Sequence, residues 1–133
     1  MRVAIIALVI TIALLSSQPA VAHHSFAGTY DAAKEVTIKG KLVEVSLRSP
    51  HSFFFVEAED ANGKVQRWAV EGASASQFAQ QGVTRDALKV GDVVEVIGNP
   101  ARSMTTGFRA RLLKITRPAD GWSWGTRAGE QVQ

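Results

Sequence analysis

Histidine is the residue type best suited to chemistry in this sequence, and it occurs only at His23, His24 and His51. The first two directly follow Ala20-Val21-Ala22, a small-x-small pattern typical of signal-peptide cleavage. A cut there would give His23 a free α-amino group, whose ordinary pKa of about 7.7–8.0 lets a metal displace its proton. The amine and imidazole of His23 would then chelate a metal ion from one residue. A second imidazole, from His51 or His24, would complete a nitrogen site suited to Cu(II).

The segment before these histidines is predicted to be a cleavable signal peptide over residues 1–22. Arg2 is its only charge, and the run from Val3 to Leu15 is apolar apart from Thr11. As a helix, that run is too short to span a bilayer core of about 30 Å. We therefore expect a periplasmic or secreted protein, cleaved near Ala22-His23, with no stable membrane span after cleavage. The alternative is an uncleaved membrane anchor.

A second candidate site combines aromatic and arginine side chains on two neighbouring strands. Aromatic rings interleaved with arginine can stack against bases or sugar rings. Three consecutive phenylalanines must point to alternating faces of a strand, so at least one is in the core. We expect Phe53 and Phe55 there, and leave open whether Phe54 and Trp68 face the core or the surface. The residues of this alternative site are Phe54, Arg67, Trp68, Arg109 and Arg111.

The remaining residue types argue against most catalytic chemistry. Without cysteine, the chain has no thiol nucleophile, no disulfide and no lipidated cysteine anchor. It also lacks the G-x-S-x-G, P-loop and H-E-x-x-H patterns of common catalytic sites. Glu57, Glu59 and Asp60 are close in sequence, but strand alternation sends neighbouring side chains to opposite faces. A hydrolase with Glu57 or Glu71 as its base has no motif in its favour.

Charge is weakly informative over the whole chain and uneven along it. Lys and Arg outnumber Asp and Glu by 15 to 12, and basic residues prevail after residue 100. A basic C-terminal face would suit a polyanion, and it would equally suit the solvated side of a strand. Nucleic acid is not an expected partner, because exported proteins rarely meet it.

Five segments have the alternation and the β-branched or aromatic content of strands. In the first segment, the apolar residues move from one face of the strand to the other near Gly40, which suggests a bulge or a sharp bend. Asn62-Gly63 predicts a tight hairpin turn between the second and the third. The five segments are residues 34–47, 51–59, 64–71, 93–98 and 108–116.

One segment has a helical pattern. Residues 73–81 are rich in Ala and Gln and are followed by Gly82, which predicts a short helix with a glycine at its end. Five strands with a helix between the third and the fourth is the order of an OB-fold, a small Greek-key barrel. We therefore predict a mainly β protein, a five-stranded OB-like barrel with one short helix, over residues 34–117. A five-stranded sandwich of another type is the alternative.

The two flanks of this domain are predicted to lack regular structure. Residues 23–33 have no clear periodicity and suggest an extended arm, which could reach about 35 Å. Such an arm would allow almost any approach of His23 to His51. Residues 118–133 contain Pro118 and several glycines, which suggest a flexible tail.

A set of short motifs runs in a characteristic order over nearly the whole of the expected mature chain. Its members are Ala22-His23-His24-Ser25-Phe26, Tyr30-Asp31, Val36-Thr37-Ile38-Lys39-Gly40, Ser49-Pro50-His51, Trp68-Ala69-Val70-Glu71, Leu88-Lys89-Val90-Gly91-Asp92 and Gly98-Asn99-Pro100-Ala101. From about residue 22 to 116, this order resembles the small exported bacterial proteins grouped as domain of unknown function 6152. Members typically have Asn where Ser49 stands, and often Gly-Ser-Pro where Gly72-Ala73-Ser74 stands. The resemblance implies a periplasmic barrel, brings no activity with it and draws attention to the three histidines.

Two function classes follow from these observations. The first is an exported, non-enzymatic binding protein that holds a copper-type metal ion through His23, with His51 or His24 as the next ligand. The alternative is a polyanion or glycan binding module that uses the aromatic and arginine face of the second and third strands. A looser resemblance to bacterial periplasmic OB-fold proteins also implies binding rather than catalysis. An envelope partner that pairs with an exposed strand edge is a further alternative.

Overall fold

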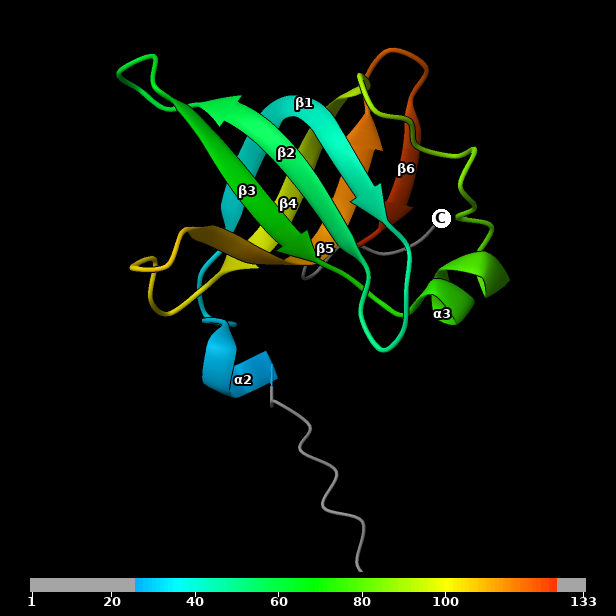
Figure 1. Cartoon of the computed structure of the whole chain (residues 1–133), viewed down its shortest axis with the longest axis horizontal. Coiled ribbons are helices and arrows are strands. Elements are labelled where there is room, and N and C mark those ends of the chain that lie inside the picture. The colour runs from blue at the N-terminus through cyan, green and yellow to red at the C-terminus, as the bar shows by residue number, and fades with distance from the viewer. Residues whose placement is uncertain (1–25, 127–133) are drawn as a thin grey trace, which may run out of the picture.

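The computed structural model describes residues 26–126, and five of its strands form a closed barrel (Figure 1). Neighbouring strands follow the order β3-β2-β1-β4-β5, and a parallel pairing of β3 with β5 closes the circle. This confirms the predicted OB-like barrel. The five strands are β1 (Val36–Ser46), β2 (Phe53–Glu59), β3 (Val65–Glu71), β4 (Val93–Pro100) and β5 (Phe108–Arg117).

Helix α3 (Ala75–Gln80) lies between β3 and β4 in the chain, as the sequence predicts. Ser74 begins it as the N-cap: its hydroxyl accepts from the Gln77 backbone N–H, and the Gln77 side chain accepts from the Ser74 N–H. This capping box satisfies two backbone donors that a helix otherwise leaves open. The buried Phe78 ties the helix to the barrel by packing edge-on against Phe54, with ring centroids 5.6 Å apart.

Alternate residues of each strand point into the barrel and form one core. Burying these apolar side chains is the main force that stabilises the fold, at about 25 cal/mol for each Å² removed from water. Phe54, Val56 and Ala58 of β2 face inward, so Phe53 and Phe55 face outward. The prediction that Phe53 and Phe55 face the core is therefore wrong. Across the barrel, the core also contains Ile38, Leu42, Val70, Val94, Val96, Ala110, Leu112 and Ile115.

The first strand has a bulge close to Gly40, as predicted. The pairing of β1 with β2 shifts register between Leu42 and Glu44, and this bulge changes which residues face the core. Gly40 is required for a different reason, because a Cβ at this position would collide with the Glu57 carbonyl oxygen of β2. The two backbones approach each other too closely there for any side chain.

The hairpin between β2 and β3 forms as predicted. Gly63 has a φ of 75°, a conformation that only glycine adopts without cost. The carboxylate of Asp60 accepts hydrogen bonds from the backbone N–H groups of Asn62 and Lys64, at 2.9 and 3.0 Å. Because this turn fixes the register, Phe54 pairs with Val70 and both point inward.

The N-terminal arm is not extended where the structure describes it. Residues Phe26–Thr29 form the short helix α2, and Tyr30 pairs with Ala101 beyond β4. Tyr30 is buried, so the arm docks onto the barrel through an aromatic side chain. This correction matters for function, because a docked arm cannot reach every part of the surface.

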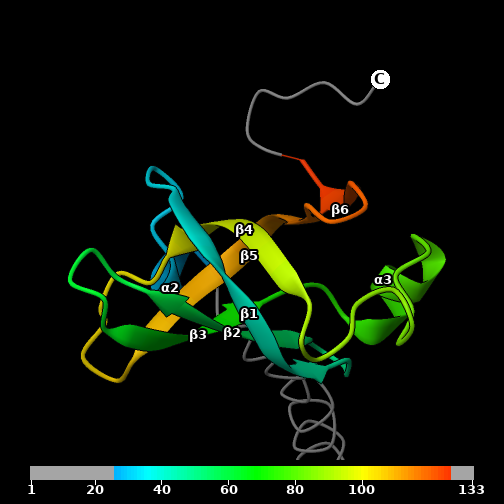
Figure 2. The same cartoon turned by 90° about the horizontal axis from the view of Figure 1, so that it is seen from above.

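The predicted flexible tail is also wrong in part. Residues Trp122–Gly125 form a further strand, β6, which pairs antiparallel with the second half of β5. Trp124 packs against Phe78 with ring centroids 4.6 Å apart, and its indole N–H donates to the Gln81 side chain at 2.7 Å. Figures 1 and 2 show β6 and α3 toward one side of the barrel and α2 toward the other.

Candidate functional site

His51 lies in the loop between β1 and β2, which Figure 1 shows passing between α2 and α3. The next residue, Ser52, fixes this loop. Ser52 is fully buried; its backbone N–H donates to the Ala73 carbonyl, and its own carbonyl accepts from the Gly72 N–H, both at 2.9 Å. Its hydroxyl also bonds to the backbone of Arg48. The loop therefore holds His51 beside the end of β3.

Glu71, the last residue of β3, is the centre of the side-chain cluster that His51 joins. Its side chain is 13% exposed. One carboxylate oxygen, Oε2, accepts a hydrogen bond from the Tyr30 hydroxyl and lies 3.6 Å from the Arg109 guanidinium. The other, Oε1, lies 3.7 Å from His51 Nδ1. Glu71 thus joins the arm, the β1–β2 loop and β5.

Burial and the Glu71 carboxylate both raise the pKa of the Tyr30 phenol above its ordinary range. Burial has the larger effect, because a phenolate loses solvation in the interior. The phenol therefore keeps its proton and acts as a hydrogen-bond donor to Glu71. This bond fixes both the arm and the direction of the carboxylate.

The start of the described chain lies directly against His51. The Phe26 ring meets the His51 ring edge-on, with centroids 5.1 Å apart. The Arg111 guanidinium also lies over the Phe26 ring, 4.5 Å from the ring centroid. Arg102 adds a further restraint, because its Nε donates to the Ala27 carbonyl at 2.9 Å. These contacts come from separate elements and hold α2 in one place.

The two ring nitrogens of His51 have different surroundings. Nδ1 is buried and makes no hydrogen bond, and the Glu71 Oε1 atom lies 3.7 Å from it. The His51 side chain nevertheless remains 33% exposed. A proton on Nδ1 would face the carboxylate and leave the Nε2 lone pair for a ligand. Metal-binding histidines usually donate their other ring N–H to a carboxylate or carbonyl oxygen, and the Glu71 carboxylate lies on that side of His51 without forming the hydrogen bond.

A pocket of about 270 Å³ adjoins His51 and Glu71. Phe26, Arg111 and Trp124 form other parts of its lining, so it lies between the arm, β5 and β6. The pocket gives a small ion or molecule access to this cluster.

The structure tests the predicted metal ligands only in part. His23 and His24 lie outside the described residues. Between residues 26 and 126, no group of three or more His, Cys, Asp or Glu side chains could hold a metal ion. His51 and Glu71 form a pair, and a complete site needs ligands from elsewhere.

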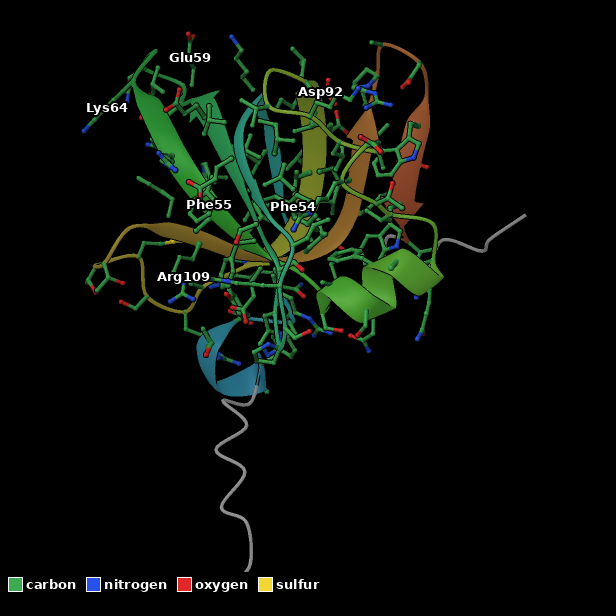
Figure 3. All side chains as sticks on the ribbon, turned by 45° about the vertical axis from the view of Figure 1, so that its right-hand side comes forward. Phe54, Phe55, Glu59, Lys64, Asp92 and Arg109 are labelled. Carbon is green, nitrogen blue, oxygen red and sulfur yellow. The ribbon has the colours of Figure 1, made fainter. Side chains whose placement is uncertain are left out.

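The alternative surface differs from its predicted form. Phe54 is in the core, as Figure 3 shows, and cannot contact a surface ligand. Trp68 shares the inward-facing side of β3 and packs against Phe108, with centroids 5.2 Å apart. Arg67 is exposed, lies over the Phe55 ring at 4.9 Å and pairs with Glu44 at 2.7 Å.

Arg109 and Arg111 of β5 pair in register with Ala69 and Glu71 of β3, which in turn pair with Phe55 and Phe53 of β2. Both are on β5 beside the arm, where Arg109 contacts Glu71 and Arg111 contacts Phe26. Figure 3 shows Arg109 close to α2 and far from the hairpin tip that carries Glu59 and Lys64. Both arginines are half-buried and share the outer face of the barrel with Phe53 and Phe55, but their side chains contact Glu71 and the arm instead of those two rings.

Sequence reasoning missed the roles of Tyr30 and Glu71 as neighbours of His51. Phe26, Tyr30 and Glu71 do occur in the ordered motifs that the chain shares with its predicted family. That co-occurrence was a signal that these residues belong to one site. No spacing rule joins them, because Tyr30 and Glu71 are 41 positions apart.

The strand order and the helix position define an OB-fold barrel, here with an N-terminal arm docked beside a histidine–carboxylate pair. The chain belongs to the Family of unknown function (DUF6152), whose family model matches residues 11–109. No curated protein matches this chain. Within residues 26–126, no helix has the length and apolar character to cross a membrane.

Solved structures similar to this chain include the mitochondrial single-stranded DNA binding protein Rim1 of S. cerevisiae in two crystal forms. Form 1 matches with a TM-score of 0.49 and 12% identity, over 64% of this chain and 92% of that chain. Form 2 matches with a TM-score of 0.47 and 12% identity, over 62% of this chain and 91% of that chain. At this identity the likeness concerns the fold alone, and it says nothing about a ligand of this chain.

Proposed function

We propose that the protein is exported, is cleaved after Ala22 and serves as a non-enzymatic binding protein for a copper-type metal ion. The ion would be held between His51 and the new N-terminus at His23. The observation that carries this proposal is the contact between the His51 and Phe26 rings, because Phe26 is only three residues from His23.

Chain geometry limits where the terminal histidines can lie. Consecutive Cα atoms are about 3.8 Å apart, so the Cα atom of His23 is within about 11 Å of that of Phe26. That of His24 is within about 8 Å by the same rule. An undocked arm would have permitted about 35 Å. Docking of α2 thus makes a shared site with His51 the simplest arrangement.

The ligand set follows from the chemistry of these groups. His23 would supply its α-amino nitrogen and its imidazole, and His51 would supply Nε2. Three nitrogens of this kind suit Cu(II). His24 is the alternative source of an imidazole. Glu71 would hold the Nδ1 proton of His51 and so present Nε2 to the ion.

The test is a Cu(II) competition titration of the chain beginning at His23, beside the same chain with its α-amino group acetylated. Acetylation blocks the amine nitrogen and so removes the amine–imidazole chelate, and we therefore expect affinity to fall about tenfold or more. His51→Gln should weaken binding to a similar degree, and His24→Ala shows whether the second histidine contributes.

Two results would overturn this proposal. The first is equal, weak Cu(II) binding by the native, acetylated and His51→Gln chains. The second is an intact mass, measured on protein from the exporting cell, that places the cut anywhere other than after Ala22.

A polyanion or an acidic glycan is the second candidate ligand, and a stack of side chains on the outer face favours it. The Phe53 and Phe55 rings stack with centroids 6.3 Å apart. Arg48 lies 5.3 Å from the Phe53 ring, as Arg67 lies over Phe55. Alternating rings and cations of this kind can stack sugars and pair with acidic groups.

For this second function, Phe55→Ala and Arg67→Ala should each weaken binding to an acidic polysaccharide. Affinity should also fall steeply with salt, because released counterions drive such binding. Lys64→Ala, at an exposed cation on the hairpin tip, is the matched control. Absence of binding to acidic polysaccharides at low salt would remove this candidate.

A further inference from the structure

A separate pocket of about 550 Å³ lies between the end of β1 and residues 85–90, the segment that precedes β4. Its volume falls within the range of about 300–1,000 Å³ that is typical of small-molecule sites. It shares no lining residue with the pocket beside His51. Neither proposed function uses it.

Hydrogen bonds anchor the backbone next to the two segments that line this pocket. On the β1 side, the Leu42 N–H donates to the Asp92 carbonyl at 2.8 Å, and the Gly91 N–H donates to the Leu42 carbonyl at 2.7 Å. From β5, Arg117 Nη1 donates to the Ala87 carbonyl at 2.7 Å and to the Asp92 carboxylate at 2.8 Å. A preformed site binds without the cost of ordering a loop.

Apolar side chains form much of the lining. Leu88 is buried, and Val45 and Leu47 pack on the barrel core while still reaching the pocket. Val90 also lines the pocket and is 66% exposed. A ligand with an apolar body would remove this surface from water.

Two cations complete the lining. Arg85 and Lys89 are exposed, and neither side chain forms an ion pair with another residue in the described part of the chain. Arg67, Arg109 and Arg117, in contrast, each contact a carboxylate. No carboxylate among the described residues lines the pocket. The charge at this site is therefore available for an anion.

We propose that this pocket binds a small amphiphilic anion, of which a medium-chain carboxylate is the simplest form. The alkyl chain would lie against Val45, Leu47 and Val90, and the carboxylate would pair with Arg85 and Lys89. This inference is independent of the metal proposal, because it uses other residues and another part of the barrel.

The test is a calorimetric titration of the full mature chain with decanoate at low salt, below the micelle concentration, followed by NMR of the Val and Leu methyl groups. We expect saturable binding, with shifts at Val45, Leu47 and Val90. Acetate, which lacks the chain, and decyltrimethylammonium, which carries the opposite charge, should bind at least tenfold more weakly. Equal binding by either compound, or no binding of decanoate, would overturn the proposal.

Substitutions locate the site. The double variant Arg85→Gln, Lys89→Gln should weaken decanoate binding at least tenfold, and Val90→Asp should do the same. Because all three positions are exposed, the thermal midpoint should not change. Lys64→Gln, at the hairpin tip in Figure 3, is the matched control and should leave binding intact. Parental affinity in the double variant would contradict the inference, as would binding to anionic phospholipid vesicles without binding of free decanoate.

Discussion

Among individual residues, Glu71 has the most consequential contacts. One of its oxygens is held by Tyr30 and Arg109, which leaves the other directed at His51. Replacement of the carboxylate by an amide would preserve shape and an acceptor for Tyr30, but it would remove the charge beside His51 Nδ1. The residue is thus a positioning residue in the proposed metal site.

We predict that Glu71→Gln lowers Cu(II) affinity about 10–100-fold, the usual effect of losing a carboxylate that orients a metal-binding histidine. A competition titration on the chain beginning at His23 measures this. Glu57→Gln is the matched control, because Glu57 is an exposed carboxylate on the neighbouring strand. Unchanged affinity in Glu71→Gln, with Cu(II) still bound through His51, would show that the carboxylate does not position the histidine.

Two elements outside the five-stranded barrel change how the molecule presents its site. Helix α2 brings the N-terminal arm to His51, and β6 extends the sheet beyond β5. Trp124 of β6 lines the pocket beside His51 and also covers Phe78 of α3. The C-terminal strand therefore supports the site as well as the core.

At this scale we predict that Trp124→Ala lowers the free energy of unfolding by about 1–3 kcal/mol. The estimate combines a lost aromatic pair with Phe78 and a lost hydrogen bond to Gln81, each worth about 0.5–1.5 kcal/mol. Urea unfolding measures the change. Ser123→Ala, at an exposed position of the same strand, should have little effect. Equal stabilities for the two variants would mean that β6 is not needed for folding.

Across the whole molecule, Arg117 connects segments that are far apart in the chain. Its guanidinium bonds to Asp92 at the start of β4 and to Asp120 in the turn before β6, both at 2.8 Å. Two hydrogen bonds lower the pKa of the Asp92 carboxyl below its usual range. The larger effect comes from the backbone N–H of Lys89 and the next from the Arg117 guanidinium. The pKa of the Asp120 carboxyl is also lowered, mainly by the hydrogen bond from Arg117 and secondly by the one from the Trp122 backbone N–H.

These shifts predict how stability depends on pH. A carboxyl whose pKa is lower when folded stabilises the fold above its unfolded pKa of about 3.9, and the contribution is lost as pH falls toward the folded value. Asp92→Asn should therefore be less stable than the parent at pH 7, and the difference should shrink below about pH 4. Urea unfolding between pH 3 and 7 measures it, with Asp86→Asn as the exposed control. A difference that stays constant with pH would contradict the prediction.

Much of the secondary structure could be predicted because its signals are local. The hairpin needs only Asp60, Asn62 and Gly63, and the helix needs only the short segment after Gly72. The orientation of Phe54 could not be predicted from three adjacent phenylalanines. The alternation of a strand allows either Phe54 alone, or Phe53 and Phe55 together, to face the core. Pairing with β3 decides which of them faces the core.

By itself, the sequence determined a mainly β chain with an OB-like succession of strands and helix along the chain and an Asn-Gly hairpin, because each of these features depends on neighbouring residues. Tertiary structure alone decided where the arm docks, that residues 122–125 form a strand, and that His51 meets Glu71. Those features depend on contacts between distant positions: Tyr30 and Glu71 are 41 residues apart, and Trp124 and Gln81 are 43. No local pattern encodes such contacts, which form only when the closed barrel brings its strands and loops together.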